Sequence, residues 1–303
     1  MSADVSTVLP LVTGLIVISV TAAFWLGRKF LFSMAPPITL INKDTKYSLK
    51  LIEKRSLNHD TRVFKFELPS PNHVLGLPVG QHVFLTAKVD DKLVIRPYTP
   101  ISCEDDKGYM ELLVKVYFKG VHPKFPEGGK MTQYLENMKI GESIDVRGPN
   151  GLLVYKGLGL FKIQAEKKLP AKDHKYKKLC MIAGGSGITP MYQMIHCILK
   201  NPNDKTQLWL LYANQTESDI LLRNELDELA ANHPDSFKCW YTLDRPQPDW
   251  KYSTGFVNDE MISSHMCPPA SDVLVTMCGP PPMIQFACTP ALDKLNYKNR
   301  FAF

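Results

Sequence analysis

The chain has 303 residues, 45% of them hydrophobic and 22% charged, with a formal net charge of +6. This length exceeds one average domain, so we expect two. The charge favours an acidic partner, but the sequence lacks the dense basic blocks of a nucleic-acid-binding protein. Seven cysteines, none spaced as Cys-x-x-Cys, are typical of a reducing compartment. We therefore expect no nucleic-acid partner and no bound metal.

The amino terminus carries a long uncharged segment. No residue between Asp4 and Arg28 is charged, and residues 5–26 are long enough as a helix to cross most of a bilayer core of about 30 Å. Positive charge follows this segment and none precedes it, so the carboxy-terminal side is expected to face the cytoplasm. A cleaved signal peptide or a buried helix is the alternative. We predict a membrane anchor over residues 1–29 and a linker over 30–45.

Residues 46–153 contain short apolar or alternating runs separated by turn residues, a pattern that predicts an antiparallel β-barrel domain. One helix is expected at 131–138, directly after Gly128, Gly129 and Lys130. Backbone N–H groups at the start of such a helix are a natural seat for phosphate oxygens. The expected strands cover residues 47–57, 63–68, 82–88, 93–98, 109–117 and 143–147.

A polar tetrad, Arg96-Pro97-Tyr98-Thr99, closes one of these expected strands. Arg96 can hold a phosphate through two hydrogen bonds, and Tyr98 offers a flat face on which a ring could stack. Taken singly, such an arginine is more often a solvated surface residue and such a tyrosine more often a core residue. Their occurrence together with a glycine pair ahead of a helix favours a flavin site.

After a lysine-rich stretch over residues 154–177, interpreted as a solvated connector, strands and helices alternate over 178–303. This alternation predicts an α/β domain with a doubly wound parallel sheet. Ligands of such sheets bind at the carboxyl ends of the strands. The expected strands are 179–183, 207–213, 237–243 and 273–278, and the expected helices are 190–199, 220–232, 258–264 and 281–295.

Two loops at those strand ends have unusual sequences. The first strand runs into GGSGITP (184–190), where the glycines allow close backbone approach, and the last runs into CGPPPM (278–283), where three prolines fix the chain beside a cysteine. Neither is the Gly-x-Gly-x-x-Gly fingerprint nor a Gly-Lys-Thr phosphate loop. Both could be plain strand-to-helix turns.

Four motifs occur in a fixed order along the chain: RPYT (96–99), GGKMT (128–132), GGSGITP and CGPPPM. In this order they resemble the NADH-cytochrome b5 reductases, within the ferredoxin-NADP reductase superfamily, over residues 47–303. The resemblance implies FAD and NADH as cofactors and cytochrome b5 as electron acceptor. It also implies an endoplasmic reticulum or outer mitochondrial membrane location with the catalytic domains facing the cytoplasm. Ser186 and Tyr192 depart from the usual family residues.

The resemblance assigns roles to individual residues. His82 would pair with Thr99 near the flavin and relay a proton, Lys115 would line the flavin and nicotinamide, and Cys278 would pack beside the nicotinamide without acting as a nucleophile. The residues expected to bind FAD are Arg96, Pro97, Tyr98, Thr99, Tyr117, Gly129, Lys130, Met131 and Thr132, and those expected to bind NADH are Gly185, Gly187, Thr189, Asp244, Gly279, Pro280 and Met283.

Two questions stay open at the level of the sequence: whether NADH or NADPH is preferred, and which electron acceptor is used. Asp244 matches the family carboxylate that repels the 2'-phosphate of NADPH, whereas the adjacent Arg245 could attract it. The sequence shows no haem or iron–sulfur ligand pattern, so an external acceptor is required. The same two domains could reduce a quinone or another haem protein, or serve as a membrane-tethered nucleotide-binding scaffold without turnover.

Overall fold

The computed structural model describes residues 35–121 and 126–303. The chain divides into a unit Met1–Pro37 and a unit Ile38–Phe303, and the helices and strands given below belong to the second unit. Within the described ranges, no helix is long and apolar enough to cross a membrane. The predicted anchor over residues 1–29 lies outside the described residues.

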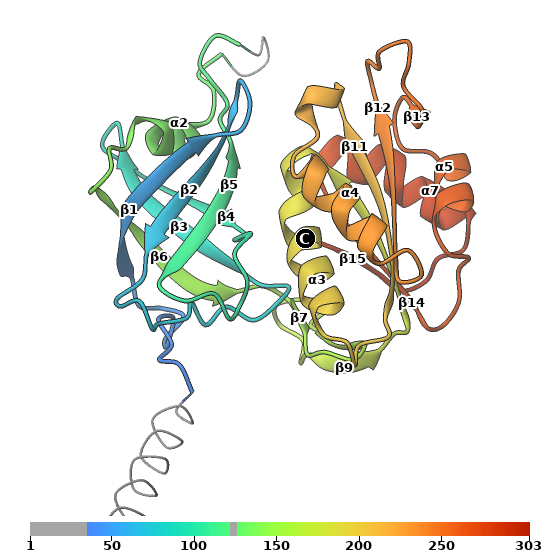
Figure 1. Cartoon of the computed structure of the whole chain (residues 1–303), viewed down its shortest axis with the longest axis horizontal. Helices are drawn as coiled ribbons and strands as arrows, with labels where there is room; N and C mark the ends of the chain where they lie inside the picture. The colour runs from blue at the N-terminus through green and yellow to red at the C-terminus, as the bar shows by residue number, and fades with distance from the viewer. Residues whose placement is uncertain (1–34, 122–125) are drawn as a thin grey trace, which may run out of the picture. The chain divides into compact units, whose positions relative to one another are not determined.

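A curved antiparallel sheet forms the first domain (Figure 1), with six strands in the order β4-β3-β6-β1-β2-β5. Bulges between Leu51 and Glu53 and between His82 and Phe84 bend its strands. The predicted antiparallel β-domain is confirmed, with one α-helix, α2, among its described residues. The elements are β1 (Tyr47–Ser56), β2 (Thr61–Glu67), β3 (His82–Val89), β4 (Lys92–Tyr98), β5 (Tyr109–Lys115), α2 (Lys130–Asn137) and β6 (Ser143–Asn150).

The core of this domain follows from the alternation of apolar residues along its strands. Phe64 and Phe66 of β2 are fully buried, as is Leu85 of β3. Met131 and Leu135 of α2 pack into the same cluster, so the helix is fixed against the sheet. Strand β4 lies at the edge of the sheet and has a neighbouring strand on one side only. Proline, which has no backbone N–H to donate, is tolerated at such an edge, as at Pro97.

The lysine-rich stretch after the first domain is a small antiparallel sheet, so the interpretation as a solvated connector is wrong. Strands β7 (Leu153–Tyr155), β8 (Leu160–Ile163) and β9 (Lys172–Lys175) pair in the order β7-β8-β9. Its lysines face outward, while Phe161 is fully buried and Tyr176 is nearly so. The lysines therefore indicated only the solvent-exposed face of this sheet, and the buried aromatic face was not predicted.

The second domain is a parallel sheet in the order β13-β12-β11-β10-β14-β15, as predicted for a doubly wound fold. Figure 1 shows α3 and α4 on one face and α5 and α7 on the other. The elements are β10 (Lys178–Gly184), α3 (Ile188–Lys200), β11 (Gln207–Asn214), α4 (Arg223–Asn232), β12 (Phe237–Leu243), β13 (Ser253–Thr254), α5 (Asp259–His265), β14 (Val273–Cys278), α6 (Pro281–Met283), α7 (Thr289–Lys294) and β15 (Arg300–Ala302).

Strand β10 divides its side chains between the two helical layers. Leu179 and Met181 pack in the cluster that contains α3, whereas Cys180 and Ile182 pack in the cluster that contains α5 and α7. Both faces of a central parallel strand are therefore apolar. The long helix expected at 281–295 is instead α6, a π-helical segment (Ile284–Cys288) and α7 in succession.

The two domains share part of their core. Val63 of β2 and Leu113 of β5 belong to the same buried cluster as α3 and β10. A buried hydrogen bond also crosses between them, in which the Gly80 backbone N–H donates to the Gln193 side-chain oxygen at 2.7 Å. These contacts join the antiparallel sheet to the carboxyl-end region of the parallel sheet.

Candidate active site

The two unusual loops of the second domain touch each other through their backbones. They follow the neighbouring strands β10 and β14, on which Ala183 is the partner of Cys278. A β-carbon on Gly187 would collide with the Cys278 carbonyl group, and one on Gly184 would lie 2.6 Å from the Met283 sulfur. Only glycine permits this approach, so the glycine requirement comes from packing between the loops.

The first of these loops leaves open space on its other side. Gly185 has a φ of +53°, a conformation that favours glycine, and nothing lies within 4 Å of a β-carbon built on it. Its carbonyl oxygen accepts a hydrogen bond from the Tyr212 hydroxyl at 2.9 Å. Thr189 is buried, and its hydroxyl donates to the Ser186 carbonyl at 3.3 Å. Hydrogen bonds therefore fix the loop on one side, while the side of Gly185 on which a β-carbon would lie is open to a ligand.

Along the carboxyl ends of the parallel strands, the next polar residue is Asn214 on β11. Its side chain is buried, and among the described residues neither its amide nitrogen nor its amide oxygen has a hydrogen-bond partner. Buried polar groups are normally paired, so this site fits a polar ligand at the sheet edge. The Asp244 backbone N–H donates to the Asn214 carbonyl at 3.0 Å, which places the predicted specificity residue beside it.

Arg245 does not compete freely for a phosphate. Its guanidinium donates to the Gln215 side-chain oxygen at 2.8 Å, and its backbone N–H donates to the Gln215 carbonyl at the same distance. Burial raises the pKa of the Asp244 carboxyl and the charge of Arg245 partly offsets this, yet Asp244 remains exposed at the end of β12. The arrangement presents the carboxylate of Asp244 and restrains its basic neighbour.

The first domain gathers its predicted residues around Tyr117. The Gly129 backbone N–H donates to the Tyr117 carbonyl at 2.8 Å, and the Tyr117 N–H donates to the Thr132 hydroxyl at 3.2 Å. A β-carbon on Gly129 would crowd Thr132 and would lie 3.2 Å from that of Tyr117. The start of α2 is therefore held against the segment after β5, where its first-turn N–H groups lack helical acceptors and fit a phosphate.

The edge strand β4 presents the tetrad to the same region. Arg96 and Pro97 are exposed and Tyr98 is half-buried. Burial raises the pKa of the Tyr98 hydroxyl, while the charge of Arg96 lowers it and Tyr117 raises it, so all three groups are close in space. The Arg96 guanidinium donates to the Ile95 carbonyl at 2.8 Å. An exposed arginine at a sheet edge, next to Tyr98 in the chain and with Tyr117 nearby, fits a flavin nucleotide.

Met131 and Lys130, two further residues predicted to bind FAD, differ in exposure and therefore in what they can contribute. Met131 is 2% exposed in the domain core, so only its backbone N–H can face a ligand. Lys130 is exposed and lies 3.9 Å from the Asp90 carboxylate. At the start of α2, Lys130 therefore supplies charge and Met131 anchors the helix.

The register between β3 and β4 points to His82 and Thr99 as neighbours across the two strands. Val83 is the partner of Tyr98, and continuing this register by one residue places Thr99 opposite His82. Burial lowers the pKa of the His82 imidazole, and Lys167 lowers it further. A neutral imidazole next to a hydroxyl can accept and return a proton.

Lys115 links the two halves of the site. Its ammonium lies 2.8 Å from Asp60 in the first domain and 3.2 Å from Asp219 in the second. Burial lowers its pKa, but the two carboxylates more than offset this, so the pKa is raised overall. Strand β5, which ends at Lys115, also lies against the turn Gly185–Gly187. A lysine predicted to line both cofactors thus stands where the domains meet.

Cys278 is half-buried at the end of β14, and burial raises the pKa of its thiol to about 11. The thiol is therefore neutral near pH 7, which agrees with a packing role and not with a nucleophile. Gly279 packs against Gly184, whose α-carbon would lie 3.2 Å from a β-carbon on Gly279. Pro280 and Met283 complete this turn beside Gly184.

Sequence reasoning missed the acidic partners of Lys115 and the interdomain role of Gln193. Asp219 is 104 residues from Lys115, and no local spacing predicts that pair. A weak signal existed in Thr216 and Asp219, which form a capping box that fixes the Asp219 carboxylate. The hydrogen bond from the Tyr212 hydroxyl to the Gly185 carbonyl also has no signal in the sequence.

An antiparallel domain fitted for a flavin nucleotide and a parallel domain fitted for a nicotinamide nucleotide define a two-domain flavin- and nicotinamide-dependent oxidoreductase. Family models agree: an oxidoreductase FAD-binding domain matches residues 48–155 and an oxidoreductase NAD-binding domain matches residues 181–289. The cofactors are therefore FAD and NADH.

Curated relatives narrow the class to one family. NADH-cytochrome b5 reductase 2 of Gallus gallus is 59% identical over 267 residues, 88% of each chain, and that of Xenopus tropicalis is 56% identical over 99% of this chain and 100% of its own. The cytochrome b5 reductase domain of Ulva prolifera nitrate reductase is 42% identical, with a TM-score of 0.82 over 89% of this chain and 100% of its own. The chain belongs to the NADH-cytochrome b5 reductase family.

Proposed function

We propose that this protein takes a hydride from NADH and passes single electrons to cytochrome b5, and that residues 1–29 anchor it in a membrane. The observation that carries the catalytic part is the junction at Lys115, where β5 lies against the turn Gly185–Gly187 and the ammonium bridges the two domains. FAD would supply the conversion of one two-electron donor into two one-electron transfers. The protein supplies binding, orientation and exclusion of water.

The first domain binds FAD along β4 and the start of α2. Arg96 would neutralise pyrophosphate charge, and the N–H groups of Lys130, Met131 and Thr132, beside Gly129, would donate hydrogen bonds to phosphate oxygens. The rings of Tyr98 and Tyr117 would offer flat faces to the flavin. Thr99 donates a hydrogen bond to the flavin ring, and His82 holds or returns the proton at that hydroxyl. This uses the exposed tetrad and the tight contact between Tyr117 and Gly129.

The second domain binds NADH along the carboxyl ends of β10, β11 and β14. Gly185 and Gly187 allow the nicotinamide to approach, while Cys278, Gly279, Pro280 and Met283 close the space behind it. Asn214 pairs with the adenosine half, which accounts for its unpartnered side chain. The exposed Asp244 carboxylate repels a 2'-phosphate, so NADH is preferred over NADPH.

We expect electrostatic attraction to speed the encounter between this basic protein and its electron acceptor. The chain carries a net charge of +6, and an acidic haem-protein surface is attracted to such a protein before contact. Screening over about 8–10 Å at ordinary ionic strength weakens this attraction. The rate of cytochrome b5 reduction is therefore expected to fall as salt increases.

The membrane proposal rests on the uncharged residues 5–26 followed by Arg28 and Lys29. It places the catalytic unit on the cytoplasmic face of the endoplasmic reticulum or outer mitochondrial membrane. Replacing Ile16 and Val17 by aspartate should release the expressed protein from the membrane fraction while its activity with NADH stays intact. Retention of the double variant in washed membranes would contradict the anchor.

Steady-state reduction of cytochrome b5 tests the proposed acceptor. Purified protein should reduce it with NADH much faster than with NADPH, and kcat/KM for cytochrome b5 should decline steadily from low to high salt. Ferricyanide, a small artificial acceptor, serves as the control for the NADH half-reaction. Normal ferricyanide reduction with no cytochrome b5 reduction would point to another acceptor, such as a quinone. No flavin bleaching on NADH addition would leave only a nucleotide-binding scaffold.

A further inference from the structure

Two cysteine thiols meet at the end of the second domain away from the cofactor loops. Cys180 lies near the start of β10 and Cys267 lies two residues after α5, 87 positions further along the chain. Their sulfur atoms are 3.2 Å apart in the buried cluster on the α5 side of the sheet. Neither residue takes part in the proposed hydride transfer.

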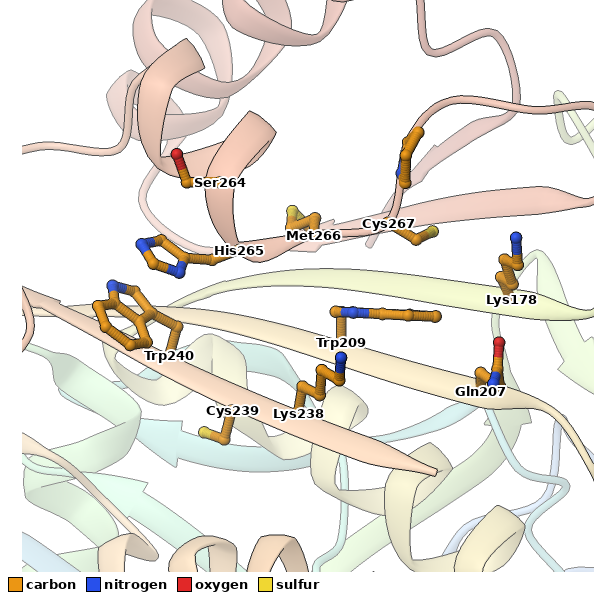
Figure 2. Close-up of a pocket in the computed structure, with 11 residues that line it drawn as sticks. Lys178, Gln207, Trp209, Lys238, Cys239, Trp240, Ser264, His265, Met266 and Cys267 are labelled. Atoms are coloured by element: carbon orange, nitrogen blue, oxygen red, sulfur yellow. The ribbon is translucent and has the colours of Figure 1, made fainter. Parts of the chain in front are cut away.

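One of the two thiols borders a cavity of about 400 Å³ near the amino-terminal ends of β10, β11 and β12. Figure 2 shows Cys267 on its wall beside Met266, with the ring of Trp209 beneath and Lys178 further along. Cys180 is fully buried behind this wall, next to its strand partner Trp209. A small reagent in the cavity therefore reaches Cys267 before Cys180.

The surroundings distinguish the two sulfurs chemically. The hydrogen bond from the Cys180 thiol lowers the pKa of Cys267, and the nearby charge of Lys178 lowers it further against opposition from burial and Asp272. The same hydrogen bond and burial raise the pKa of Cys180. The lowered pKa and the adjoining cavity favour Cys267 as the sulfur that attacks first, with Cys180 3.2 Å away in place to resolve the product.

We propose that Cys180 and Cys267 form a peroxide-sensitive thiol pair that closes reversibly to an intramolecular disulfide. The Cys267 thiolate attacks one oxygen of hydrogen peroxide, the O–O bond breaks, and hydroxide leaves and takes up a proton as water. The Cys180 sulfur then attacks the sulfenic sulfur of Cys267, forming the S–S bond while the hydroxyl group leaves with the Cys180 proton as a second water. Two electrons pass from the thiols to the peroxide, and a dithiol reductant reverses the change.

The disulfide would tie β10 to the segment after α5, and between them the chain contains α3, β11, α4, β12, β13 and α5. Such a link restricts the unfolded chain, so the thermal midpoint should rise on oxidation. Because the cofactor loops lie at the opposite strand ends, flavin reduction by NADH should change by less than about twofold. Failure of this proposal and failure of the proposed function are therefore measured separately.

Peptide mass spectrometry on the purified full-length flavoprotein tests the pair directly. After treatment with hydrogen peroxide and blocking of the remaining thiols with N-ethylmaleimide, a crosslinked peptide containing Cys180 and Cys267 should appear, about 2 Da lighter than the two thiol peptides together. Dithiothreitol should abolish it. The Cys288→Ser variant, which changes another cysteine of the same buried cluster, is the matched control and should form the same crosslink.

The Cys180→Ser variant separates the two steps. Its Cys267 should stop at the sulfenic acid, which dimedone captures, and should do so at least about ten times faster than Cys288 in the same sample. Absence of the crosslink in the wild-type protein would overturn the proposal, as would oxidation of Cys267 no faster than Cys288. The wild-type measurement needs no variant, so a poorly folded Cys180→Ser protein leaves the proposal testable.

Discussion

Replacing Gly187 by alanine should slow hydride transfer without removing FAD. Gly187 has a φ of −63°, which alanine adopts freely, so the only obstacle is contact. The new β-carbon would lie 2.5 Å from the Cys278 carbonyl carbon and 2.9 Å from the Gly279 nitrogen. The Cys278 carbonyl oxygen would be closer still, so restoring an ordinary contact of 3.4 Å moves the two loops apart by at least about 0.9 Å. A displacement of about 1 Å lowers a rate about 100-fold, or about 2.7 kcal/mol in activation free energy.

Anaerobic stopped-flow mixing with saturating NADH measures this effect as the rate at which the yellow absorbance of the bound flavin bleaches. Gly157→Ala is the control, because Gly157 has a φ of +93° but nothing lies within 4 Å of its β-carbon. It should lose about 1 kcal/mol of stability and keep its rate. A wild-type rate in a Gly187→Ala protein that retains FAD would refute the packing argument.

Three further substitutions probe the cofactor-binding residues. Arg96→Glu should yield apoprotein, seen as a lost flavin-to-protein absorbance ratio; a normal yellow spectrum would refute its pyrophosphate role. Cys278→Ser should slow flavin reduction by NADH about tenfold or more while FAD stays bound, and an unchanged stopped-flow rate would count against it. Asp244→Arg should raise the NADPH-to-NADH ratio of kcat/KM at least about tenfold, whereas an unchanged ratio would show that Asp244 does not select the cofactor.

Much of the fold was predictable because buried strands appear in the sequence as short apolar runs separated by turn residues. Strand β12 (Phe237–Leu243) and strand β14 (Val273–Cys278) have the predicted bounds, since each is a short apolar run between turn residues. The sheet β7-β8-β9 escaped prediction because lysines dominate its exposed face and only isolated aromatic residues such as Phe161 mark the buried one. Its strands of three or four residues are too short to show a period.

The candidate site also has some features that the sequence predicts and others that it does not. The GGSGITP and CGPPPM loops were recognisable because glycine and proline are tied to local backbone geometry, and their contact follows from adjacent parallel strands. The bridge from Lys115 to Asp219 was not, because it joins residues 104 positions apart in different domains. The thiol pair Cys180 and Cys267 escaped for the same reason, since its two sulfurs meet only after the sheet has formed.

Anaerobic titration of the purified flavoprotein tests the central claim most directly, that the two domains form one site for hydride and electron transfer. One equivalent of NADH should bleach the bound flavin completely, an equal amount of NADPH should act far more slowly, and two equivalents of oxidised cytochrome b5 should then restore the yellow spectrum. A flavin that stays oxidised with NADH, or a reduced flavin that cytochrome b5 does not reoxidise, would contradict the account.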